Sequence, residues 1–68
     1  MDIAICRARA KVAVDAYMAV NPDYSEDMLI NDEVVTDLIA DILHLCKAED
    51  IDTAAVLRMA EVNFEGEI

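Results

Sequence analysis

The sequence contains few of the residues that interrupt helices, with one glycine and one proline among 68 residues. Turn-rich β folds and low-complexity disordered chains use more glycine and proline, so this composition argues against both. No apolar run approaches the roughly 20 residues that cross a bilayer, and acidic Asp2 stands where a signal peptide carries basic residues. We therefore expect a helical, cytoplasmic protein with no membrane contact.

Cysteine and positive charge are also scarce. Cys6 and Cys46 form neither a disulfide framework nor a zinc-binding spacing, so we expect reduced thiols in the core. Five basic residues against 15 acidic ones give a net charge of −10, which repels a phosphate backbone and favours a basic protein partner over direct nucleic-acid binding. No glycine-rich phosphate loop and no nucleophile-histidine pair is present, so we expect no cofactor, and the sequence favours binding over catalysis.

Apolar residues are abundant, at 57% of the chain. A chain this short cannot bury so many apolar side chains in its own core, which predicts self-association. The pattern predicts an all-α fold in a single helical domain, residues 1–68, with helices at about 3–20, 31–48 and 53–64. We expect a long first helix followed by an antiparallel hairpin of the second and third helices, because their connection is short, and completion of the unit by homodimerisation.

The first predicted helix is apolar on two sides. One stripe, with steps of three and four residues, comprises Ile3, Cys6, Ala10, Ala13, Tyr17 and Val20. The predicted self-association face consists of Ile3, Ile5, Ala8, Val12, Ala16 and Ala19. A helix that is apolar on two sides is usually buried on both, so we expect a second copy of the chain to cover this face. Basic Arg7, Arg9 and Lys11 are predicted to pair with acids of the second helix or of another subunit.

Helix-capping residues mark the second and third helices. Asn31 and Asp52 are predicted N-caps, and Ser25 is a candidate cap for one short helical turn in the linker. The apolar stripe of the second helix comprises Val35, Leu38, Ile42 and Leu45, and it is predicted to face the core.

An acidic face, comprising Glu33, Asp37, Asp41 and His44, occupies the other side of the second helix. Steps of four, four and three residues place these side chains along one line. Such a cluster is typical of a solvated or partner-facing surface, and we interpret it as the partner-binding face. The alternative is a divalent-metal site, for which Asp37, Asp41 and His44 are the candidate ligands.

The second half of the chain resembles a family of known sequences. The run Val-Val-Thr-Asp-Leu-Ile-Ala-Asp-Ile-Leu-His-Leu-Cys-Lys-Ala-Glu-Asp-Ile-Asp from Val34, followed by Ala55 to Ala60 and Asn63 to Glu65, is similar to short uncharacterised helical proteins of bacteria, phages and mobile elements. The shared pattern is a helix, a short acidic turn and a helix. The resemblance implies an accessory or anti-defence protein that engages a basic protein surface.

The same segment also resembles the MazG-like all-α nucleotide pyrophosphohydrolases, whose acidic signature pairs a Glu-Glu-x-x-Glu helix with a Glu-x-x-Asp helix. This chain has Asp32 and Glu33 followed by Asp37 and Asp41, with no counterpart on the third helix. The resemblance implies, as an alternative function, a minimal metal-dependent hydrolase assembled across subunits, with the acidic face supplying the ligands.

Overall fold

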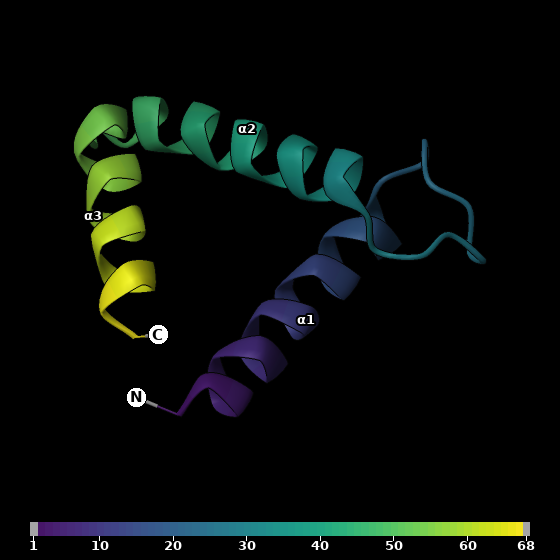
Figure 1. Cartoon of the computed structure of the whole chain (residues 1–68). Helices are drawn as coiled ribbons and strands as arrows, with labels where there is room; N and C mark the ends of the chain where they lie inside the picture. Colours follow the sequence, from purple (N-terminus) through teal and green to yellow (C-terminus); the bar gives the residue numbers. More distant parts are fainter. Residues whose placement is uncertain (1, 68) are drawn as a thin grey trace.

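The computed structural model describes residues 2–67, which fold into three α-helices and include no strand. Helix α1 spans Ile3–Val20, α2 spans Asp32–Ala48 and α3 spans Thr53–Gly66. The prediction of an all-α chain with three helices is confirmed. Figure 1 shows an open frame in which α1 meets α2 at one corner and α3 leaves α2 at another, while the beginning of α1 and the end of α3 approach each other.

Each helix begins at a side chain that caps its first turn. The Asp2 carboxylate accepts a hydrogen bond from the Ala4 amide at 2.8 Å. Asn31 accepts one from Val34 at 3.0 Å, and Asp52 accepts one from Ala55 at 3.1 Å. These bonds satisfy amide groups that have no partner within the helix. The predicted caps Asn31 and Asp52 are therefore confirmed.

The connection between α1 and α2 consists of two consecutive turns. Asn21 leaves the helical conformation, and its carbonyl accepts a hydrogen bond from the Tyr24 amide at 3.3 Å, with Pro22 at the second position of that turn. The Met28 amide donates to the Ser25 carbonyl at 3.1 Å. The single helical turn predicted after Ser25 is thus a reverse turn over residues 25–28.

The corner between α2 and α3 is formed by backbone hydrogen bonds. The Ile51 amide donates to the Cys46 carbonyl at 2.8 Å and the Asp50 amide donates to Lys47 at 3.3 Å, which together make a Schellman motif. Asp50 adopts a left-handed conformation, with φ of 59°. Beyond this motif α3 turns away from the line of α2 (Figure 1), so the predicted antiparallel hairpin is not confirmed.

The core of the described chain is very small. Val34 and Cys46 are the two buried apolar residues among residues 2–67, and Val34 is fully buried. Three residues of the apolar stripe predicted to face the core are exposed instead: Val35, Ile42 and Leu45. Among the described residues, α1 packs against α2 and α2 against α3, and α1 approaches the end of α3 where Cys6 Sγ lies 4.0 Å from Glu67 Oε2. No third helix therefore covers the stripe within residues 2–67. Within the described residues no helix is long and apolar enough to cross a membrane.

Candidate functional site

The acidic face lies along α2, a helix whose beginning is fixed by Asn31. Asp32 and Glu33 occupy its first turn, where negative charge is stabilised by the positive end of the helix dipole. Glu33, Asp41 and His44 are exposed and Asp37 is half-buried. The face therefore presents acids on a regular, capped helix and not on a loop.

Two tyrosines contact the central aspartates of this acidic face. The Tyr17 hydroxyl of α1 donates a hydrogen bond to Asp41 Oδ2 at 2.7 Å, and the Tyr24 hydroxyl of the following turn donates one to Asp37 Oδ2 at 2.6 Å. The two rings pack against each other with their centroids 6.0 Å apart and their planes tilted by 59°. Asp37 and Asp41 thus join α1 and the linker to α2, while Glu33 and His44 lie beyond them at the two ends of the face.

These hydrogen bonds favour the protonated tyrosines. The hydrogen bond to Asp37, with desolvation, raises the pKa of Tyr24 well above its ordinary value. The hydrogen bond to Asp41, again with desolvation, raises the pKa of Tyr17. A tyrosinate would lose the donated proton and place a negative charge beside a carboxylate. Both tyrosines therefore act as neutral hydrogen-bond donors at physiological pH.

Tyr24 was not expected at this site. The sequence places it in a polar linker, and it places Tyr17 on an apolar stripe, so neither was paired with the acidic face. One signal was available: Asp37 and Asp41 are one helical turn apart, and the two tyrosines flank the only proline. The hydroxyl positions depend on how the chain turns at Pro22, which the sequence pattern does not give.

His44 lies in a shallow, open hollow of about 650 Å³ where α2 meets the start of α3. Lys47 of α2 and Asp52 of the corner also line this hollow. The surroundings of His44 therefore include both signs of charge. This end of the acidic face differs from its centre, where the carboxylates meet tyrosine hydroxyls.

Within the described part of the chain, the fold does not gather metal-binding side chains at the acidic face. Among residues 2–67, no three histidine, cysteine, aspartate or glutamate side chains gather closely enough to hold a metal ion. Asp37 and Asp41 each direct one oxygen toward a tyrosine hydroxyl. The hydrolase alternative would need ligands from a second subunit, and it stays a prediction.

The predicted self-association face of α1 is exposed in all six of its residues: Ile3, Ile5, Ala8, Val12, Ala16 and Ala19. Val12 shows it most clearly, with 70% of its surface exposed. Beside it, Lys11 pairs with Asp15 of the same helix at 2.6 Å. We expected Lys11 to pair with an acid of α2 or of another subunit. It pairs instead with Asp15, one turn away in α1, because a spacing of four residues brings the two side chains together.

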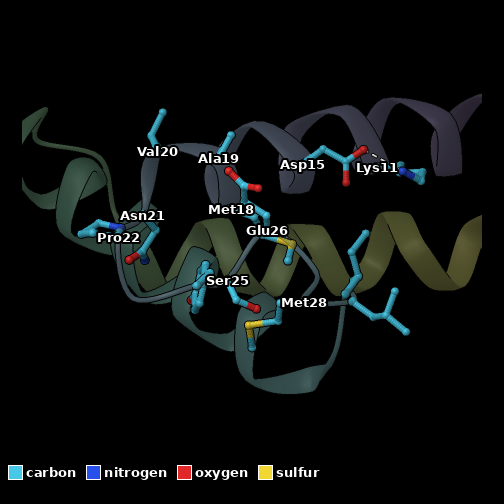
Figure 2. Close-up of a pocket in the computed structure, with 13 residues that line it drawn as sticks. Lys11, Asp15, Met18, Ala19, Val20, Asn21, Pro22, Ser25, Glu26 and Met28 are labelled. Carbon is cyan, nitrogen blue, oxygen red and sulfur yellow. Dashed lines mark hydrogen bonds and ion pairs between the residues drawn. The ribbon is translucent and has the colours of Figure 1, made fainter.

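A larger hollow of about 760 Å³ lies between the end of α1 and the linker. Figure 2 shows Met18 of α1 and Met28 of the linker among its lining side chains, with the Lys11–Asp15 pair at one end. Both methionines are half-buried. The lining is mixed, since polar Asn21, Ser25 and Glu26 join the apolar side chains.

Comparisons with protein-family models, with curated proteins and with solved structures find no match for this chain. The acidic face and the exposed apolar surfaces are therefore the features of the molecule that bear on its function.

Proposed function

We propose that the chain is a small acidic protein-protein interaction module whose acidic face binds a basic protein surface. The face consists of Glu33, Asp37, Asp41 and His44. The supporting observation is that these side chains stand in line on one capped helix of a chain with a net charge of −10. An acidic surface of this kind steers a basic partner toward it and selects against nucleic acid.

The tyrosine contacts add preorganisation to this proposal. Tyr24 donates a hydrogen bond to one oxygen of Asp37, and Tyr17 donates one to one oxygen of Asp41. An ionised carboxylate has two oxygens and about four acceptor positions, so it can still accept hydrogen bonds from an arginine or lysine. Side chains that are already ordered lose less conformational entropy when a partner binds. The two aspartates are thus fixed acceptors in the centre of the face.

Self-association is the second part of the proposal. The exposed self-association face of α1 offers apolar and small side chains that a second copy would cover, and the protein would act as a homo-oligomer. A role as an accessory or anti-defence protein of a phage or mobile element follows from the sequence resemblance. In that role the acids would occupy the basic groove of a host protein.

The test compares two charge reversals with the same net charge. The full chain, its Glu33→Lys variant and its Glu61→Lys variant are used as baits in extract of the native cell, and captured proteins are identified by mass spectrometry. Glu33 lies on the acidic face, whereas Glu61 is an exposed acid of α3. We expect a basic protein that binds the wild type and Glu61→Lys but not Glu33→Lys, with capture that weakens as salt increases.

Equal capture by all three baits would show that the acidic face is not the binding surface. Equal loss in both variants would show that total charge, and not this face, attracts the partner. Circular dichroism of both variants confirms that the helices are retained.

A further inference from the structure

The chain exposes more surface than a compact protein of its size. A compact monomer of 7.5 kDa exposes about 4,200 Å², whereas this chain exposes 5655 Å². Its radius of gyration is 13.3 Å, against about 11 Å for a compact chain of this length. Its extents of 33 × 31 × 17 Å describe a flat molecule. Roughly 1,400 Å² per chain is therefore exposed in excess of a compact monomer.

The apolar stripe of α2 is part of this excess. Val35, Ile42 and Leu45 are 37%, 42% and 60% exposed, and Leu38 is half-buried. Figure 1 shows α1 and α3 leaving α2 at its two ends, so that neither helix runs alongside it. The stripe carries no charged residue, and its steps of three, four and three residues are those of a coiled-coil contact. A charged partner would gain little from this surface.

We propose that a second copy of the chain covers the α2 stripe, with the two α2 helices packed antiparallel about a two-fold axis. The steps of three, four and three read the same in both directions. A two-fold axis near residue 40 therefore places Val35 opposite Leu45 of the partner subunit, and Leu38 opposite Ile42 of the partner subunit. Each apolar side chain of the stripe meets an apolar side chain, as a self-complementary interface requires.

The charges at the ends of α2 favour the antiparallel direction. Its first turn carries Asp32 and Glu33, and its last turn carries Lys47. Antiparallel packing brings the acidic beginning of one α2 near the basic end of the other, and it opposes the two helix dipoles. A parallel pair would instead place acids beside acids.

The area agrees with a stable dimer. The excess of roughly 1,400 Å² belongs to the whole chain, so a pair could bury at most about 2,800 Å² of it. A contact through α2 that buries half of this area, about 1,400 Å² in total, lies within the range of specific protein interfaces. The α2 stripe shares no residue with the acidic face or with the self-association face of α1, although Glu33 of the acidic face lies at the end of α2 that approaches the basic end of the other copy. Sedimentation and partner capture therefore test the two proposals separately.

Sedimentation of the full chain at micromolar concentration tests the assembly. We expect the mass of a dimer for the wild type, and a monomer with retained helicity for Leu45→Asp, because Leu45 is the most exposed residue of the stripe. The matched variant Val12→Asp disturbs the self-association face of α1 instead, and we expect it to retain at least the dimer formed through α2. A monomeric wild type, or a dimer that Val12→Asp dissociates and Leu45→Asp does not, would overturn the proposal. If both variants dissociate the dimer, the α2 pairing is supported and the interface extends to α1.

A second measurement covers the case in which Leu45→Asp fails to fold. Ile42→Ala removes apolar volume without adding charge, and we expect it to raise the dimer dissociation constant about tenfold or more. An unchanged dissociation constant would contradict the proposal.

Disulfide cross-linking tests the direction of packing. In a background of Cys6→Ser and Cys46→Ala, the double variant Val35→Cys/Leu45→Cys is expected to form covalent dimers under mild oxidation, while Val35→Cys alone is not. Efficient cross-linking of the single variant would indicate a parallel pair, and failure of the double variant would contradict the register.

Discussion

The two corners of the molecule are held in different ways. At the α1–α2 corner, the bonds Tyr17 to Asp41 and Tyr24 to Asp37 join residues 24 and 13 positions apart. At the α2–α3 corner, the bonds join residues at most five apart, such as Ile51 to Cys46. The first corner depends on side chains that meet in space, whereas the second is formed by local backbone geometry. The two corners should therefore respond to different substitutions.

The largest effect is expected from the buried residue near the α1–α2 corner. Val34 lies in the first turns of α2 and is fully buried. Val34→Ala removes two buried methyl groups and should lower the free energy of unfolding by about 2 kcal/mol. Urea unfolding followed by circular dichroism, at one protein concentration, measures the change. The exposed Val62→Ala of α3 is the control, and an equal loss in both variants would contradict a distinct role for Val34.

A smaller effect is expected at the α2–α3 corner. Asp50 is left-handed, a conformation that glycine adopts without strain. Asp50→Gly should raise the free energy of unfolding by about 0.5 kcal/mol, while the β-branched Asp50→Val should lower it by about 1–2 kcal/mol. Thermal unfolding of the two variants measures the difference. If their order were reversed, the Schellman geometry at this corner would be wrong.

The smallest effect at neutral pH is expected from the tyrosine hydroxyls, because solvent competes for these hydrogen bonds. The folded chain raises the pKa of both Tyr17 and Tyr24, so the unfolded chain ionises first as pH increases. The stabilisation they give is fully present below about pH 10, the unfolded value, and it is lost as pH rises through the higher folded values. We expect the double variant Tyr17→Phe/Tyr24→Phe to lose less stability than the wild type between neutral and alkaline pH.

Unfolding midpoints across this range, with tyrosinate absorbance recorded in parallel, measure the effect. Identical pH profiles for the variant and the wild type would show that the hydroxyls do not hold the α1–α2 corner.

The candidate site could be predicted only in part from the sequence. The spacing of Glu33, Asp37 and Asp41 puts them on one side of α2 whatever the rest of the chain does. That two of these acids would meet Tyr17 and Tyr24 could not be predicted, because it depends on the path of the chain from Asn21 to Asn31. The binding of a partner by this face stays a prediction.

The sequence by itself determined the helices and their beginnings, since Asp2, Asn31 and Asp52 act on amides within three residues and Pro22 acts on its immediate neighbour. The direction of α3 depends on the local left-handed conformation of Asp50. The tertiary structure alone decided the direction of α1, because the hydroxyls of Tyr17 and Tyr24 meet α2 across 24 and 13 residues. A stripe of Val35, Leu38, Ile42 and Leu45 indicates an apolar face in any helix, but whether that face is buried depends on what lies across from it. Among residues 2–67 no third helix lies across from it, so Val35, Ile42 and Leu45 are exposed.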